Sequence, residues 1–548
     1  MIQAQVELVP VDNKVYPFLE TMSMRGIIDY NSAIIPISRR EVAGYIVQID
    51  SSRSKLTGTE RKIVDDLEVE FSFDINRTTA NSFSLLPNLP GGLLDIFDDQ
   101  KQKYLTYYTD PNFSMFFDGI ASISYRDYNA EGFPETRLTL GEIGPRLRGT
   151  LYDAFGYYIQ ITGGQSFSGN SYARKIAATY DPVLTASLKF IGKGFVDGFV
   201  GYMRVEGLHH SLSLTIGRQS LEMGRGYIDK LFVSDNIPPF DYAGMNAHYK
   251  FFRYSFFVGN LRGDSLGSPI TSKGIVGHYL DLDISKSFRV GIFESLIIGN
   301  GPFSFTYVNP VSYLESSNFT AEIKDNNNNL MGFDCEIIPA KNLGVQLSLL
   351  LDDLNLPTLS KHDSTHAANK FGYQGGVYYA QPFGINDLTA TVEYTRIDPF
   401  VYTHKTNISS YTNWGIGIGA ALPPNSDEIA LKVDYNLTNR ISLDFLYKHQ
   451  RSGEGFLDAN GNPTLNQKGV ITRNYGGDIN RGDLDGNYYN AFLQGLRVNR
   501  DIFTISTRIE PIRQYFLDIV YSFQSIDDIY MSKRFSDQFL YVTGSVDF

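Results

Sequence analysis

The chain ends on the stretch QFLYVTGSVDF, residues 538–548, and this stretch decides the fold class. From Leu540 to Phe548 every second residue is apolar or Gly, and the residues between them are mostly polar. Side chains alternate between the two faces of a β-strand, so the stretch predicts a strand with one apolar face and one polar face. A terminal aromatic residue on such a strand resembles the signal by which the barrel-assembly machinery recognises outer-membrane barrels.

The same period of two recurs from about Phe113 onward. It is clearest in residues 388–395, 429–436, 441–448 and 515–524. The strands are expected to be about nine to eleven residues long or more, the length that a tilted strand needs to cross a bilayer. A soluble β-sandwich or propeller gives the same alternation with its apolar face turned inward, so periodicity alone leaves both classes open.

The connections between the strands separate these two classes. Short turns are predicted at residues 251–253, 285–287, 339–342, 382–384, 437–439 and 511–513. Long polar stretches lie at residues 219–241, 262–276, 353–370, 395–411, 449–487 and 526–537. Outer-membrane barrels have short turns at one end and long loops at the other. Counting hairpins back from Phe548 predicts an all-β transmembrane fold, an antiparallel outer-membrane β-barrel of about 18 strands, an even number as such barrels require.

The first hundred residues predict a small helical bundle instead. Residues 38–41 (SRRE) and 57–60 (TGTE) have the form of capping boxes, which begin helices. Apolar residues then recur with the helical period, and a third short helix is expected over residues 14–25. We therefore predict a helical bundle with its linker over residues 1–100 and a barrel over 101–548. A barrel of this size has an open lumen unless something fills it, so the bundle is expected to be a plug or a periplasmic cap.

Composition excludes several other classes of protein. The 548 residues include 60 acids, 48 bases and one Cys. One Cys excludes an intrachain disulfide framework and a thiolate metal cluster, and an acidic chain without a basic block argues against a nucleic-acid partner. Residues 1–5 (MIQAQ) resemble what remains around a signal-peptidase site. We therefore expect a mature exported chain in the outer membrane of a Gram-negative bacterium, with loops on the cell surface and both termini on the periplasmic side.

Two segments resemble a known family. Residues 15–41 contain VYPFL and PISRRE, and residues 216–239 contain IGRQ, MGRG and LFVSDNIPP. Together with the architecture, they resemble the capsule-assembly lectins of the Wzi type, in which a helical bundle precedes an outer-membrane barrel. Met223 and Arg225 stand where the family pattern has Trp and Pro. The resemblance implies a non-enzymatic, lectin-like protein, surrounded by outer-membrane lipid, that binds and anchors capsular or other surface polysaccharide during capsule assembly.

One group of candidate sugar contacts lies on the second resembling segment. Arg218, Glu222, Arg225 and Tyr227 stand where a strand enters a long loop. An Arg side chain can bind a sugar carboxylate through two parallel hydrogen bonds, and a Tyr ring can stack on a pyranose. The alternative is that these residues form a salt-bridge network inside the lumen or anchor the loop.

A second group contains Trp414, the single Trp, with Tyr402 and Tyr411 nearby. Flat aromatic rings suit the apolar face of a sugar, which makes this group a second polysaccharide-binding candidate. The alternative is an aromatic girdle, because Trp and Tyr also gather at membrane interfaces for reasons unrelated to a ligand.

Metal and catalytic sites are weakly indicated. The loop 458–487 contains DANGN and DLDGN, whose alternating oxygens could hold Ca²⁺, but the Glu expected at the twelfth position is missing from both. No Ser, His and Asp constellation can be assembled, so we expect no cofactor and no enzyme activity. The alternative function that remains open is a substrate-specific porin that uses Arg and aromatic residues as a slide for oligosaccharides.

Overall fold

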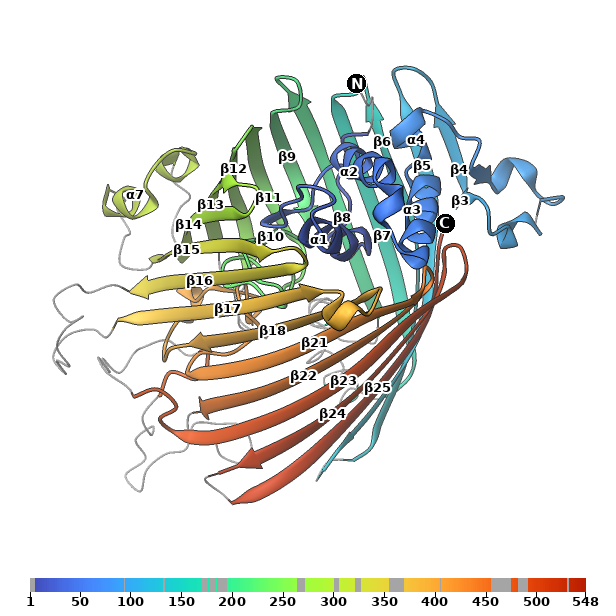
Figure 1. Ribbon diagram of the computed structural model, residues 1–548. Helices are drawn as coiled ribbons and strands as arrows, with labels where there is room; N and C mark the ends of the chain where they lie inside the picture. Colours follow the sequence, from blue (N-terminus) through green and yellow to red (C-terminus); the bar gives the residue numbers. More distant parts are fainter. Residues whose placement is uncertain are drawn as a thin grey trace.

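The computed structural model is an antiparallel β-barrel with a helical head at one end (Figure 1). It describes the chain apart from residues 1–4, 93, 132–133, most of 170–194, 264–271, 300–304, 321–326, 354–368, 405, 455–474, 481–490 and 530–531. None of the described helices is both long and apolar enough to cross a membrane.

In the described part of the chain, eighteen long strands close the barrel. They are β5 (Ser114–Ala130), β6 (Thr136–Leu151), β7 (Phe155–Ser168), β8 (Phe195–Gly207), β9 (Leu212–Gln219), β11 (Phe240–Tyr249), β12 (Phe252–Arg262), β13 (Ser272–Ser285), β14 (Phe288–Gly299), β15 (Asn327–Ala340), β16 (Leu343–Asp353), β17 (Lys370–Ala380), β18 (Leu388–Ile397), β21 (Ser426–Thr438), β22 (Ile441–Glu454), β23 (Leu496–Ile512), β24 (Tyr515–Asp528) and β25 (Lys533–Asp547). The last strand, β25, pairs with the first, β5, and the short β4 (Thr106–Thr109) extends the pairing of β5. The predicted fold class is confirmed.

The apolar face of the strands points outward. On β9, Leu214 and Ile216 are 54% and 64% exposed, whereas Ser213 and Thr215 between them are each 4% exposed. A soluble sandwich has the opposite arrangement, with its apolar face buried against a second sheet. An outward apolar band around a polar lumen is the arrangement of a barrel that faces lipid.

The six predicted short turns all join consecutive strands at the same end of the barrel, which we call the short-turn end. The opposite end, the long-loop end, carries the longer connections. The predicted long loop at residues 526–537 is wrong, because β24 runs to Asp528 and β25 begins at Lys533. Ile526 pairs with Phe535 across these strands, so ladder hydrogen bonds continue through residues that look like a polar loop.

The head consists of α1 (Val15–Met24), α2 (Arg39–Ser51), α3 (Gly58–Glu70) and α4 (Ser72–Asn76). Both predicted capping boxes are present. The side chains of Ser38 and Thr57 each accept a hydrogen bond from the backbone N–H of the Glu three residues later, and the side chain of that Glu accepts one from the backbone N–H of the Ser or Thr. The helices pack around a buried apolar core that includes Leu19 and Val42. The helices thus lie within residues 15–76, and the domain boundary at residue 100 stays a prediction.

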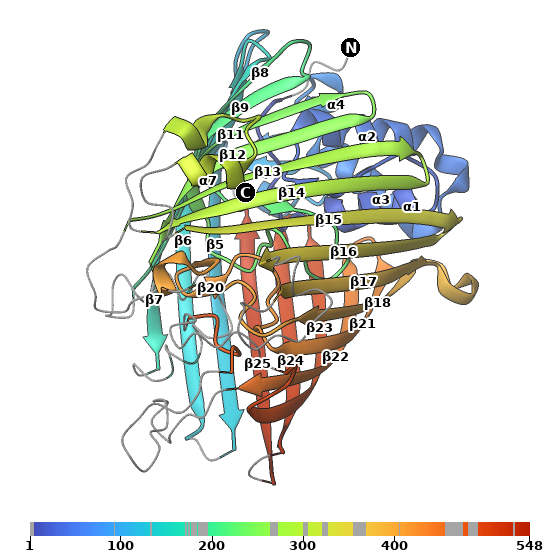
Figure 2. The same cartoon turned by 90° about the vertical axis from the view of Figure 1, so that its left-hand side faces the viewer.

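Ion pairs fasten the head to the short-turn end. Lys14 lies 2.8 Å from Glu510 of β23, and Arg40 lies 3.2 Å from Glu206 of β8. Asp66 of α3 accepts from Arg440, which stands in the turn between β21 and β22, at 3.1 Å. Figures 1 and 2 show the blue helices across this end of the barrel, beside the short turns. The head therefore closes the short-turn end.

Candidate functional site in the barrel lumen

Residues 220–239, which we call the first lumen loop, leave the wall at the end of β9 and fold into the barrel. Within this loop β10 (Glu222–Met223) pairs with β1 (Ile34–Ile35) of the head. Phe232 stacks on Phe293 of β14, with ring centroids 4.6 Å apart, deep in the apolar core of the lumen. The loop thus joins the head to the inner wall and occupies the middle of the lumen.

Arg225 anchors this loop through two buried carboxylates. Its guanidinium pairs with Asp281 of β13, and its Nε lies 3.4 Å from Oδ1 of Asp334 on β15. The hydroxyl of Tyr279 donates to Asp334 at 2.8 Å. The side chain of Arg225 is 4% exposed and both carboxylates are 0% exposed, so each charge depends on the others for compensation.

Glu393 of β18 makes a second anchor. Its carboxylate accepts hydrogen bonds from three successive backbone N–H groups, those of Tyr227 at 2.8 Å, Ile228 at 3.2 Å and Asp229 at 3.1 Å. Hydrogen bonds to a charged acceptor are the stronger kind, and three of them fix the backbone of this segment. The Tyr227 hydroxyl also donates to Glu336 of β15 at 3.1 Å.

Residues 398–425, the second lumen loop, lock onto the first. The hydroxyl of Tyr402 donates to the carbonyl of Leu231 at 2.7 Å, and that of Tyr411 donates to the carbonyl of Phe232 at 3.0 Å. The two Tyr rings stack with centroids 5.5 Å apart and are 0% and 1% exposed. The two loops therefore form one packed body across the lumen.

Trp414 follows these residues and lies beside Arg262, the last residue of β12. The guanidinium carbon of Arg262 stands 4.0 Å from the centre of the indole ring. The backbone N–H of Arg262 donates to Asn413 at 3.0 Å. This Arg and Trp pair presents a flat, charged surface toward a cavity that the two lumen loops leave along one side of the barrel.

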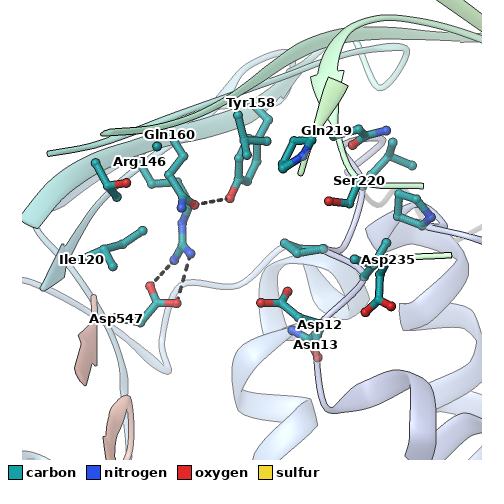
Figure 3. Close-up of a pocket in the computed structure, with 18 of the residues that line it drawn as sticks. Asp12, Asn13, Ile120, Arg146, Tyr158, Gln160, Gln219, Ser220, Asp235 and Asp547 are labelled. Atoms are coloured by element: carbon teal, nitrogen blue, oxygen red, sulfur yellow. Dashed lines mark hydrogen bonds and ion pairs between the residues drawn. The ribbon is translucent and has the colours of Figure 1, made fainter. Parts of the chain in front are cut away.

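That cavity has a volume of about 1320 Å³. Its walls are the head, residues of β5–β9 and β23–β25, both ends of the first lumen loop, the adjoining ends of β11 and β12, and the Arg262 and Trp414 pair. Figure 3 shows Asp12 and Asn13 from the head facing Arg146 and Asp547 from the wall across it. The cavity reaches from Arg513 in the turn between β23 and β24 to the end of β12, and so follows the lumen lengthwise.

The wall of the cavity carries paired charges and amides. Arg146 donates to Asp118 at 2.7 Å. It also donates to Asp547 at 3.0 Å, and Tyr158 donates to Gln160 at 2.7 Å (Figure 3). These groups alternate with apolar residues that face outward, so the strands that form the membrane wall also present this polar surface to the lumen.

Asp66 lies where the head meets the cavity. Burial by itself would raise the pKa of this carboxyl group, but hydrogen bonds from Arg440 and Asn439 and the charge of Arg513 outweigh burial and lower the pKa below its usual value. The charged form of Asp66 is therefore the form that fastens the head to the wall.

Comparison with known proteins identifies the family. Residues 195–488, more than half of the chain, match the family model described as capsule assembly protein Wzi. The chain belongs to the Wzi capsule assembly family. The matched range includes both lumen loops and the Trp414 region. No curated protein sequence matches the chain.

The solved structure of Wzi from Escherichia coli has the same fold. The two structures have a TM-score of 0.56 and 13% sequence identity, and the match covers 99% of each chain. That protein is described as a carbohydrate-binding β-barrel of the outer membrane involved in group 1 capsule assembly. OprD from Pseudomonas aeruginosa is more distant, with a TM-score of 0.44, 9% identity, and coverage of 79% of this chain and 95% of that chain. At these identities, the likeness to the Escherichia coli protein shows the fold alone.

The structure places the first group of sequence-predicted site residues in two environments. Arg225 and Tyr227 lie inside the lumen as anchors of the first loop, which is the alternative role that the sequence left open. Glu222 pairs with Lys230 of the same loop at 3.0 Å. Arg218 of β9 pairs with Asp241 of β11 at 2.6 Å, and both residues line the cavity. Their contact with a sugar stays a prediction.

The second group is also divided. Tyr402 and Tyr411 are buried in the joint between the lumen loops, whereas Trp414 lines the cavity. The aromatic-girdle alternative does not describe these three residues, because they belong to a loop inside the barrel. Their role in binding polysaccharide stays a prediction, with Trp414 the member that a ligand in the cavity would meet.

Sequence reasoning missed the wall of the cavity, above all Arg146, Gln160 and Arg262. One signal was present: Arg146 and Arg148 are two residues apart on β6 and so must share a face. Among the described residues, no group of three or more His, Cys, Asp or Glu side chains could hold a metal ion. The suggested calcium loops, residues 458–462 and 483–487, lie outside the described residues.

Proposed function

We propose that this chain is a non-enzymatic outer-membrane protein that binds and anchors capsular or other surface polysaccharide during capsule assembly. The long loops would face the cell surface, and the head with the short turns would face the periplasm. Membership of the Wzi family supports this function, as does the fold shared with a carbohydrate-binding barrel.

The observation that carries the proposal is the way the lumen is filled. The head lies across one end and the two lumen loops pack together inside, and they leave a cavity lined by Arg, carboxylate, amide and aromatic groups. Those groups match a polysaccharide, whose hydroxyls and carboxylates take hydrogen bonds and whose ring faces stack on aromatic residues. Arg262 and Trp414 offer both kinds of contact at one point.

The proposal includes no catalytic step. Among the charged groups that line the cavity, Arg146 pairs with Asp547, Lys14 with Glu510 and Arg513 with Asp66. Paired groups of this kind hold a ligand's hydroxyls rather than supply a free acid and base on either side of a bond. We also propose that the barrel-assembly machinery recognises β25, after which Phe548 packs against Tyr515 with ring centroids 5.4 Å apart.

Direct binding tests the proposal. Purified protein in detergent or nanodiscs is titrated with the surface polysaccharide purified from the strain that carries this gene. We expect saturable binding that weakens when Trp414 and Arg262 are replaced by Ala. The matched control is Arg534→Ala, an Arg with a 74% exposed side chain on β25 that is not among the cavity lining. Absence of binding by the native protein, or equal binding by all variants, would contradict the proposal.

A substrate-specific porin is the second candidate, and one observation favours it. The cavity follows the lumen from the short-turn end, at Arg513, to the end of β12, at Arg262. A porin would require this cavity to open to solvent at both ends of the barrel. Planar bilayers separate the two functions: the anchoring protein is expected to show negligible conductance, whereas a steady large conductance and uptake of oligosaccharides into proteoliposomes would favour the porin.

A further inference from the structure

A segment of the chain lies against the outside of the barrel. Residues 305–318 include η4 (Phe305–Val308) and most of α7 (Leu314–Thr320), and they pack on the outer face of the strands from β12 to β15. Figures 1 and 2 show α7 outside the wall, beside the long-loop half of β14. The side chains of Tyr307 and Leu314 pack with outward-facing apolar residues, among them Phe256 and Leu296. We call residues 305–318 the outer segment.

The outward direction of this wall surface follows from alternation along β14. Phe293 stacks on Phe232 of the first lumen loop, so it faces the lumen. Its neighbour Glu294 must therefore face outward, and Leu296 and Ile298 continue the same outward row. The outer segment covers this row from Glu294 onward, since Glu294, Leu296 and Ile298 are all buried.

Polar groups on the outer wall bind the outer segment. The carboxylate of Glu294 accepts from the backbone N–H groups of Leu314 and Glu315, both at 2.9 Å, and lies 3.1 Å from Nε2 of His278 on β13. On β12, the hydroxyl of Tyr254 lies 3.1 Å from Nδ1 of His278 and donates to the carbonyl of Pro310. These contacts give the polar groups of the wall partners that lipid could not supply.

The position of Glu294 along its strand places the outer segment at the depth of the lipid. On β16, which lies beyond β15 on the same wall, the outward residues Leu343, Val345, Leu347, Leu349 and Leu351 are all apolar. A strand needs about nine to eleven residues to cross the bilayer. On β14 the outward apolar row starts at the short-turn end with Phe288, Val290 and Ile292, and Glu294 comes next, well within that length.

A carboxylate turned toward lipid at that depth is unfavourable. The outer segment removes this cost, because it covers Glu294 and replaces lipid over this part of the wall.

The largest exposed side chains of the segment are apolar or aromatic, and its exposed polar residues, Thr306, Asn309 and Ser316, are uncharged. Phe305 is 91% exposed, Val311 83% and Tyr313 53%. Residues 305–318 contain one charged residue, Glu315, whose carboxylate accepts from Asn329 of β15 at 2.8 Å. Below the segment on the same wall, Ile292 and Phe333 are 42% and 45% exposed and continue the apolar surface. The outer segment thus extends the lipid-facing surface of the barrel outward.

We propose that the exposed face of the outer segment binds the acyl chains of outer-membrane lipid. The segment lies against the wall at the depth of the bilayer, has no charge on its exposed face, and is continuous with the lipid-facing band. The inference goes beyond polysaccharide binding, because it assigns a lipid-contact surface to a part of the chain remote from the lumen.

The single native Trp makes a direct test possible. Trp414→Phe gives a background without Trp, into which Phe305→Trp and Tyr313→Trp each introduce one Trp by an aromatic exchange. Each folded variant is reconstituted in phosphatidylcholine vesicles with or without bromine on the acyl chains, which quenches Trp by contact. For both variants we expect a blue-shifted Trp emission maximum. In the brominated vesicles most of the Trp emission should be quenched.

Three controls calibrate the readout. Ile292→Trp on the bare wall of β14 should be quenched by brominated lipid, whereas Val47→Trp on the exposed face of α2 should be quenched by aqueous iodide. Native Trp414, inside the lumen, should be insensitive to brominated lipid.

Quenching of the Phe305 and Tyr313 variants by iodide but not by brominated lipid would overturn the proposal, because the segment would face water. Protection from both quenchers would also overturn it, because a protein partner or a second copy of this chain would cover the segment.

Discussion

Replacing Arg225 by Met should release the first lumen loop. The substitution keeps the unbranched stem of the side chain but removes the guanidinium, whose charge compensates Asp281 and Asp334, which are both 0% exposed. Removing one partner of a buried ion pair costs about 3–5 kcal/mol, because the remaining charge is left uncompensated. Each 1.4 kcal/mol changes an equilibrium tenfold. The ratio of docked to undocked loop should therefore fall by roughly a hundred-fold to a few thousand-fold.

Single-channel recording in planar bilayers is the assay for this loss. The native protein is expected to stay closed, whereas Arg225→Met should show frequent openings. Added protease should also cleave the first lumen loop faster in Arg225→Met. Combining Arg225→Met with Asp281→Asn and Asp334→Asn removes the uncompensated charges and should restore much of the closed state. Arg218→Met is the matched control: Arg218 and its partner Asp241 have side chains 39% and 52% exposed, so their pair is worth at most about 1 kcal/mol.

Equal conductance of native protein and Arg225→Met would refute this reasoning, as would an equal effect of Arg218→Met. A triple variant that opens more often than Arg225→Met alone would also refute it. In that case, the uncompensated charges of Asp281 and Asp334 would not be what destabilises the docked loop.

Three further predictions concern other contacts. Glu393→Ala should cost about 2–3 kcal/mol of loop docking, because three partly buried backbone N–H groups lose their shared acceptor, and limited proteolysis within residues 220–239 measures this. Trp414→Ala should weaken polysaccharide binding about tenfold, the effect of losing one aromatic contact, as measured by calorimetric titration. Because the pKa of Asp66 is lowered in the folded protein, its contribution to head docking is present above about pH 4 and is lost as the pH falls further. Protease susceptibility of the head between pH 3 and 7 should show this loss, and Asp66→Asn should abolish the pH dependence.

The architecture could be read from the sequence because its causes are local. The period of two on β24 and β25, the short turns between the strands of each hairpin, and the two capping boxes each depend on residues only a few positions apart in the chain. The direction of the apolar face could be inferred from the asymmetry of the connections. The loop at residues 526–537 was misjudged because polar residues at the long-loop end can remain paired in strands that extend beyond the apolar band.

The lumen could not be read in the same way, since its contacts join residues far apart in the chain. Arg225 meets Asp281 and Asp334 on two separate strands, and nothing near Arg225 in the sequence indicates that its loop folds inward. The same holds for Tyr402, whose hydroxyl bonds to Leu231. Residue type identified these side chains as able to bind a sugar, but only their burial shows that they hold the two loops together.

The partition of polysaccharide between cells and medium tests the central claim most directly. The gene is deleted in the strain that carries it, and the surface polysaccharide is measured in washed cells and in the culture supernatant. If this chain anchors the polysaccharide, the cell-attached share falls, the supernatant share rises by a matching amount, and the native gene restores both. An unchanged partition in the deletion strain, with total polysaccharide also unchanged, would contradict the account.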